Sequence, residues 1–145
     1  MNPVSTDISH VIQLAVAPVF LLAGIGAFIN AFAGRLARVV DRSRNLEAKL
    51  TGHDPRARNA ALAEVEILGR RARLAYLGIT LGIGSALLVC LVIVAAFLGH
   101  FFGLRVGQYL GALFVAAMLC LIGALLAFLR EVFLAIKYLP IGRAS

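Results

Sequence analysis

Six arginines lie at two points where apolar runs of the sequence meet charged segments. They are Arg35, Arg38 and Arg42 after the first run, and Arg70, Arg71 and Arg73 before the second. We call these six residues the arginine belt. Spacings of three and seven residues place the first three on one side of a helix. Guanidinium groups bind carboxylates and phosphates, so the chemistry that this pattern predicts is anion binding.

Two anionic environments fit the arginine belt. The general one is the headgroup layer of anionic lipids, where each basic residue near the surface contributes ~1 kcal/mol. The sharper one is a ring of arginines around the cytoplasmic vestibule of an oligomer, which would favour anions. Nucleic acid is not an expected partner, because residues 34–73 contain no Phe, Tyr or Trp on which a base could stack.

Other reactive side chains form no recognisable catalytic pattern. Cys90 and Cys120 lie inside apolar runs and fit small buried hydrophobes. His10 and His100 are expected near the outer membrane surface, but they are an incomplete metal-ligand set, and whether they act together stays open. We therefore expect no enzyme, no catalytic residue, no metal and no cofactor.

The apolar runs themselves define the class of protein. The chain has 145 residues, of which 61% are hydrophobic and only 14% charged, whereas a soluble domain is roughly 25% charged. Residues 11–33, 74–99 and 106–129 contain no Asp, Glu, Lys or Arg. Each run is near the ~20 residues that a helix needs to cross a bilayer. The sequence predicts an all-α membrane protein with three transmembrane helices in a single membrane domain, residues 1–145.

The positions of the basic residues predict the orientation. Ten of the 14 basic residues lie in residues 34–73, and three more follow the third apolar run. The positive-inside rule therefore places this loop and the C-terminus in the cytoplasm, and the N-terminus outside. The absence of carboxylates from the spans argues against proton-coupled or sodium-coupled transport.

Residues 34–73 are predicted to form an antiparallel helical hairpin that extends the first two membrane helices. Apolar residues recur near helical spacing on both sides of the TGHDP turn. Asp54 is expected to cap the second arm, with Pro55 at its first helical position. Each arm would extend ~17 residues, or ~25 Å. Pairing of the arms about the turn would bring Arg42 near Glu64.

Residues 130–139 predict an amphipathic C-terminal extension, either an interfacial helix or a continuation of the third span. Phe128, Val132, Phe133 and Ile136 form its apolar side. The charged residues, among them Glu131, are expected elsewhere on the helix, away from that apolar side.

Small and polar residues within the spans predict how the helices pack. Small residues let helices approach closely, within one chain or between chains. The candidates for packing are Gly24, Ala27, Gly34, Gly78, Gly82, Gly107 and Gly111. The candidate intramembrane polar residues are Gln13 and Asn30, and Asn30 fits interhelical hydrogen bonding better than a pore ligand. Because three helices make a thin bundle, we expect a homo-oligomer.

Three stretches of the sequence carry a resemblance to a known family. They are ISHVIQLAVAPVFLLAGI (8–25), GRLARVVDRSRNLE (34–47) and RRARL before the second span. Together they resemble a bacterial family of small three-helix membrane proteins catalogued only as a domain of unknown function. The resemblance implies three spans, a charged cytoplasmic loop and the bacterial inner (plasma) membrane.

Two functions from different classes are compatible with this pattern. The first is a non-enzymatic homo-oligomeric bundle that forms an ion-permeable channel with an arginine-rich cytoplasmic mouth. The alternative is an accessory or scaffold subunit whose charged hairpin docks a protein partner. Reconstitution in bilayers and capture of a stoichiometric partner separate the two.

Overall fold

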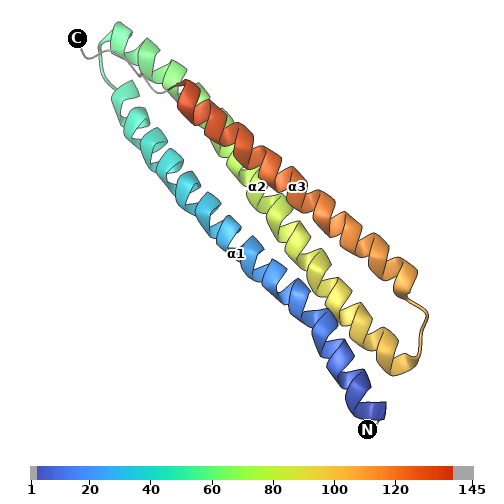
Figure 1. Cartoon of the computed structure of the whole chain (residues 1–145). Helices are drawn as coiled ribbons and strands as arrows, with labels where there is room; N and C mark the ends of the chain where they lie inside the picture. Colours follow the sequence, from blue (N-terminus) through green and yellow to red (C-terminus); the bar gives the residue numbers. More distant parts are fainter. Residues whose placement is uncertain (1–2, 139–145) are drawn as a thin grey trace. The chain divides into compact units, whose positions relative to one another are not determined.

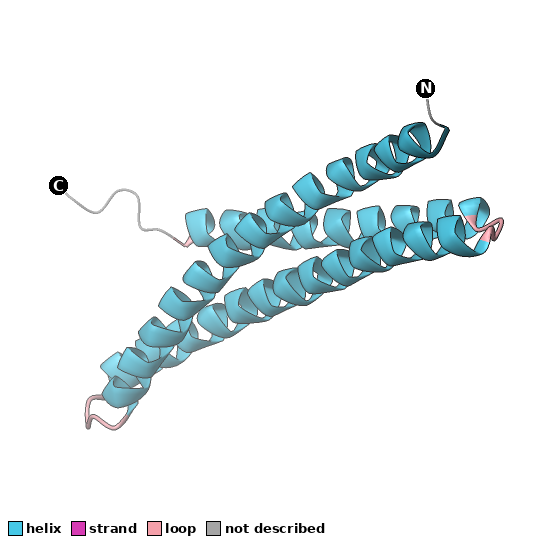
Figure 2. Cartoon of the chain, turned by 90° about the horizontal axis from the view of Figure 1, so that it is seen from below, coloured by secondary structure: helices cyan, strands magenta, loops and turns pink. Residues whose placement is uncertain are grey.

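The computed structural model describes the backbone of residues 3–138, and the side chains from residue 8 onward except that of Val11. Three helices make up this part of the chain: α1 (Pro3–Leu50), α2 (Pro55–Phe102) and α3 (Gly107–Lys137) (Figure 1). No strand occurs among residues 3–138 (Figure 2). Each helix contains a segment long and apolar enough to cross a membrane. The predictions of an all-α fold and of three spans are therefore confirmed.

The first two helices run far beyond their apolar segments. Helix α1 continues without a break from its span to Leu50, and α2 starts at Pro55, well before its span. The predicted helical hairpin is therefore confirmed. Helix α3 likewise continues to Lys137, so the described part of the C-terminal extension belongs to the same helix as the span. Residue 139 lies outside the described residues.

The turn between α1 and α2 follows the predicted capping pattern. The Arg56 amide donates a hydrogen bond of 3.0 Å to Asp54 Oδ1, so Asp54 is the N-cap of α2 and Pro55 its first residue. On the other side of the turn, Thr51 Oγ1 donates to the carbonyl of Ala48 at 2.7 Å, which satisfies one of the last carbonyls of α1.

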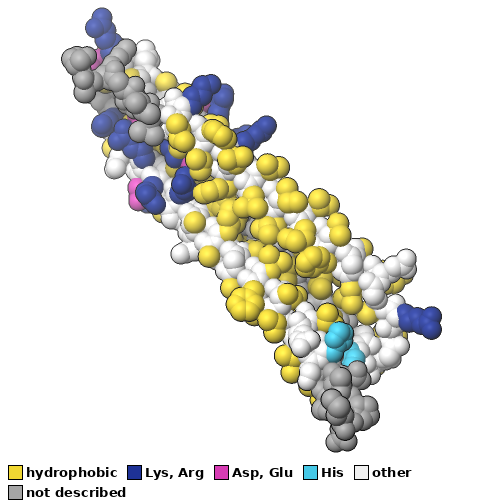
Figure 3. Space-filling view, viewed as in Figure 1, with side chains coloured by type: hydrophobic (Ala, Val, Ile, Leu, Met, Phe, Trp, Pro, Cys, Tyr) yellow, Lys and Arg dark blue, Asp and Glu magenta, His cyan; other side chains and the backbone are white. Residues whose placement is uncertain are grey.

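The chain divides into two compact units, and each helix contributes one segment to each of them. The first unit comprises Met1–Ile29 and Leu81–Gly123, and the second comprises Asn30–Thr80 and Ala124–Ser145. On the face shown in Figure 3, most Lys and Arg side chains gather toward the end of the chain that holds the turn between α1 and α2, and apolar side chains cover its middle.

The first unit is built around a small apolar core. Ile25, Val89 and Ala117 are buried at its centre, one from each helix. Beside them, the buried Ser85 hydroxyl donates 2.8 Å to the carbonyl of Ala117, which joins α2 to α3. The short loop between these helices turns at Gly103, whose φ of 62° is accessible to glycine without strain.

The second unit contains the hairpin arms and the ends of the spans that meet them. Val39, Leu46, Ala61 and Leu68 form its buried apolar cluster, at the helical spacing that the sequence shows. Arg42 Nε lies 2.8 Å from Glu64 Oε1 beside this cluster. The predicted pairing of the two arms is therefore confirmed.

Most of the apolar surface of the spans is not used within the chain. In the most apolar stretch of 18 residues in α1, only 6% of the residues are buried, and in the corresponding stretches of α2 and α3, 17% are buried. Many large apolar side chains are exposed along the spans, Phe20 and Leu91 among them. In a bilayer this surface contacts lipid or other membrane helices, as expected for a multi-pass membrane protein.

Candidate functional site

Glu131 lies at the centre of a polar cluster in the second unit. Its side chain is only 1% exposed and accepts hydrogen bonds from both other helices. Arg35 Nη1 of α1 donates 3.1 Å to Oε2, and Arg71 of α2 donates to Oε1 from Nε at 3.2 Å and from Nη2 at 2.9 Å. One carboxylate thus joins all three helices.

Aromatic side chains pack against this cluster on its apolar side. The rings of Phe32 and Phe128 meet edge to face, with centroids 5.0 Å apart. The Arg35 guanidinium carbon lies 4.9 Å from the centre of the Phe128 ring, within the range of a cation–π contact. Phe32 is fully buried and occupies the space where a side chain on Gly78 would project. Glu131 is therefore held between charged partners and a packed aromatic pair.

A buried carboxylate is stable here because its charge is compensated twice. An isolated carboxylate transferred out of water would be strongly unfavourable. Two guanidinium groups and three hydrogen bonds from them offset that cost at Glu131. Both carboxylate oxygens accept hydrogen bonds from arginines of the other two helices, so the cluster is suited to holding the three helices together.

The sequence pattern placed Glu131 away from the apolar side of the C-terminal extension, but it did not indicate that this carboxylate is buried. Helix α3 turns Glu131 toward Arg35 and Arg71. The ion pairs with these two arginines compensate the cost of burying the carboxylate. A signal was available in the sequence. Arg35, Arg71 and Glu131 each lie two or three residues from the hairpin-side end of a predicted span.

The remaining belt arginines have different partners. Arg42 pairs with Glu64, as described above, and Arg70 pairs with Glu66 one helical turn away at 3.1 Å. Arg38 is exposed, and its Nε donates 3.3 Å to the carbonyl of Gly34. Arg73 is also exposed. Neither Arg38 nor Arg73 forms an ion pair with a described carboxylate.

The predicted packing glycines separate into two groups. A Cβ on Gly78 would lie 2.5 Å from Phe32 Cζ, and one on Gly82 would lie 3.2 Å from Ile29 Cγ1, so both glycines allow close approach of α1 and α2. A Cβ on Gly123 would lie 3.1 Å from Leu81 Cδ1, so Gly123 allows close approach of α3 and α2, although it was not among the predicted packing residues. The other predicted positions face open space or are exposed within the chain: Gly24, Ala27, Gly34, Gly107 and Gly111.

The predicted intramembrane polar residues lie on the outside of the chain. Gln13 and Asn30 are exposed, and the side chain of neither is hydrogen-bonded to the part of the chain that the structure describes. Gly26 lies four residues before Asn30 on α1 and is also exposed, with no atom near its missing Cβ. Gly26 was not among the predicted packing residues, although Gly26, Asn30 and Gly34 follow one another at intervals of four residues.

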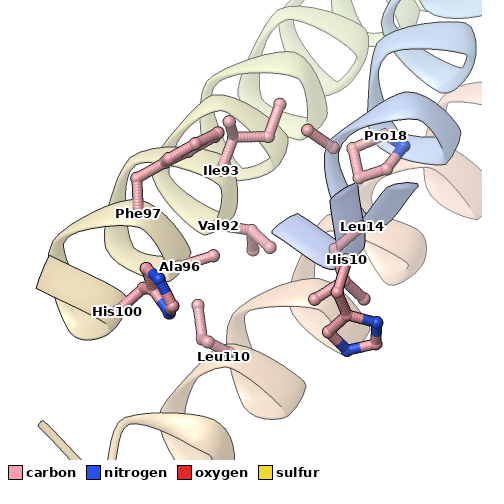
Figure 4. A pocket seen from close by; sticks show the side chains of 10 residues that line it. His10, Leu14, Pro18, Val92, Ile93, Ala96, Phe97, His100 and Leu110 are labelled. Atoms are coloured by element: carbon pink, nitrogen blue, oxygen red, sulfur yellow. The ribbon is translucent and has the colours of Figure 1, made fainter. Parts of the chain in front are cut away.

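His10 and His100 line the same pocket in the first unit (Figure 4). The pocket has a volume of about 240 Å³, and its other lining residues are apolar, among them Pro18 and Phe97. Within the described residues, no group of three His, Cys, Asp or Glu side chains is placed to hold a metal ion. The pocket offers a cavity of apolar character with two imidazoles at its wall.

The three apolar helices and the charged hairpin define a multi-pass helical membrane protein. The family described as "Protein of unknown function (DUF2721)" matches residues 15–141, which is most of the chain. The chain belongs to this family, as the resemblance of its sequence indicated. Neither a curated protein nor a solved structure matches it.

Proposed function

We propose that this protein is a non-enzymatic, homo-oligomeric helix bundle of the bacterial plasma membrane that conducts anions past an arginine-bearing cytoplasmic mouth. A row of residues on α1 carries the proposal: Gly26, Asn30, Gly34 and Arg38 follow one another at four-residue spacing. All four are exposed on the chain. The row therefore presents two glycines, an amide and a charge to whatever surrounds α1.

A second copy of the chain suits this row better than lipid does. Hydrocarbon offers no partner to the Asn30 amide, and an unsatisfied polar group there is unfavourable. The Asn30 of a neighbouring copy supplies both a donor and an acceptor. Gly26 and Gly34 have no atom within 4 Å of their missing Cβ, so a second helix finds room to approach the backbone of α1.

Arg38 provides the charge for the mouth of the pore. Arg35, Arg42, Arg70 and Arg71 are each held by a carboxylate of the same chain. Arg38 lies on the same side of α1 as Asn30 and has no such partner among the described residues. An assembly through the row would bring several Arg38 side chains around one axis, and a ring of positive charge favours anions. The positive-inside rule directs that ring to the cytoplasm, with the N-terminus outside.

Reconstitution of the full chain in planar bilayers tests the proposal. We expect a chloride-selective conductance that Arg38→Glu abolishes or reverses in selectivity. Arg44→Glu is the matched control, because Arg44 is an exposed arginine of the same helix that lies outside the row. It should leave the selectivity anion-favouring. Equal effects of both substitutions, or a silent bilayer, would contradict the proposal. Silence together with one stoichiometric partner on the hairpin would favour the scaffold alternative.

The oligomer is tested separately by native mass spectrometry. We expect the wild-type chain to give one defined oligomer in mild detergents, and Asn30→Leu to shift it toward the monomer. Gln13→Leu is the control, because it also removes an exposed amide from α1 but lies outside the row. A monomeric wild-type mass in several mild detergents would contradict the proposal.

A further inference from the structure

Three arginines of the second unit line a hollow of about 210 Å³: Arg35, Arg38 and Arg71. We infer that this hollow binds one phosphate group, in the form carried by an anionic phospholipid headgroup or by soluble phosphate. The site goes beyond the proposed conduction of anions and does not rest on it. It requires one chain only and a ligand that stays bound.

The charge of the hollow calls for an anion. Its three arginines carry three positive charges, and Glu131, which contacts two of them, carries one negative charge. Two positive charges are left over. Two other carboxylates of the second unit, Glu64 and Glu66, pair with arginines outside the hollow. Charge of one sign that is partly buried beside apolar segments is unfavourable unless an opposite charge compensates it. A phosphate monoester carries close to two negative charges, and a phosphodiester carries one.

The arginines of the hollow keep N–H donors that an oxyanion can accept. A guanidinium has five N–H groups in a planar fork, which matches phosphate in two-point contacts. Glu131 engages Nη1 of Arg35, and Nε and Nη2 of Arg71. Arg38 uses only its Nε, toward the carbonyl of Gly34. Each arginine therefore retains N–H groups for a ligand, and Glu131 acts as a positioning residue that fixes the orientation of two of the three forks.

The location of the site favours a lipid as the source of the phosphate. Arg35 and Arg38 follow the first apolar span directly, and Arg71 precedes the second. The headgroup phosphates of a bilayer lie at this boundary between apolar and charged residues. The side chains of Arg35 and Arg71 are 37% and 24% exposed, so they are open to a ligand without being fully solvated. Such a site binds one headgroup, in contrast to the diffuse attraction of a charged surface.

Binding to the purified, delipidated full chain tests the site with two probes. Native mass spectrometry with phosphatidylglycerol should show one saturable lipid per chain, held more tightly than zwitterionic phosphatidylcholine. Calorimetric titration with inorganic phosphate measures the soluble source. Arg38→Gln should weaken binding of the accepted probe about tenfold or more, the loss expected for charge-assisted hydrogen bonds. Arg44→Gln removes the same charge from the same helix outside the hollow and should change the affinity less than twofold.

The possible outcomes separate a site from a charged surface. Binding of phosphatidylglycerol alone identifies the lipid headgroup, and binding of inorganic phosphate with the same dependence on Arg38 identifies soluble phosphate. Equal weakening by Arg38→Gln and Arg44→Gln, no effect of either, or no binding of either probe would overturn the inference. Arg38 is exposed, so its substitution is not expected to unfold the chain, and a thermal melt of the variant checks this. Because binding is measured without conductance, failure of the pore proposal leaves this test unchanged.

Discussion

Replacement of Glu131 by Gln tests whether its buried carboxylate holds the three helices together. The substitution keeps the shape of the side chain but removes the charge that Arg35 and Arg71 share. The amide oxygen of Gln can accept from one arginine, and its NH₂ group then faces the other as a donor facing a donor. We therefore expect the full chain to lose stability, with α3 loosened from the other two helices.

The magnitude follows from the burial of the three groups. Removal of one partner from a fully buried ion pair costs about 3–5 kcal/mol. Glu131 is 1% exposed, but its partners are 37% and 24% exposed and can recover part of their hydration once the carboxylate is gone. We expect Glu131→Gln to lower the free energy of unfolding by about 2–4 kcal/mol.

Steric trapping of the full chain in bicelles measures this free energy without extracting the protein from lipid. Glu66→Gln is the matched control, because it makes the same change in an ion pair whose two side chains are both 70% exposed. Such a pair contributes only ~0–1 kcal/mol. If Glu131→Gln lowers the free energy of unfolding no more than Glu66→Gln does, the reasoning is refuted. Burial of the carboxylate would then add nothing to its contribution to stability.

Two further substitutions test the packing of α2. Gly78→Ala would place a methyl group 2.5 Å from the buried ring of Phe32, so we expect a destabilisation of about 1–3 kcal/mol, measured by steric trapping. Gly84→Ala is the control and should be neutral, because nothing lies within 4 Å of the added Cβ. Equal effects of the two substitutions would contradict this account. Ser85→Ala removes the hydrogen bond to the Ala117 carbonyl, and we expect a loss of about 0.5–2 kcal/mol in the same assay; an unchanged stability would show that this bond contributes nothing net.

Local patterns of the sequence were sufficient to predict the hairpin. Asp54 before Pro55 combines an N-cap with a first helical residue, and one hydrogen bond from Arg56 confirms it. With the turn located, antiparallel arms have a fixed register, so the pairing of Arg42 with Glu64 followed from counting residues on either side. Capping and register are properties of adjacent segments, and they need no knowledge of a third helix.

The rotation of each membrane helix about its axis was harder to predict. Small residues occur on several sides of the spans, and composition does not say which side meets a neighbour. Gly78 and Gly82 face α1 within the chain, whereas Gly24 and Gly107 face open space. The sequence pattern is the same in both cases. What decides between them is the packing of large side chains such as Phe32 around each glycine, which depends on all three helices at once.

Glu131 shows how depth in the membrane adds information that periodicity lacks. It is the last acidic residue of the chain, and the preceding one is Glu66, 65 positions earlier. On periodicity alone it belongs to the polar side of α3.

The distance of Glu131 from the end of the third span, however, equals that of Arg35 from the end of the first, and Arg71 precedes the second span by three residues. Because α1 and α3 run in the same direction and α2 runs against them, these three residues meet at one level along the helices, where Glu131 contacts both arginines. One carboxylate and two guanidinium groups at one level, at the edge of an apolar layer, are more stable together than apart. The belt arginines are thus not equivalent: two are held inward by Glu131, and Arg38 beside them remains available to an anion from outside the chain.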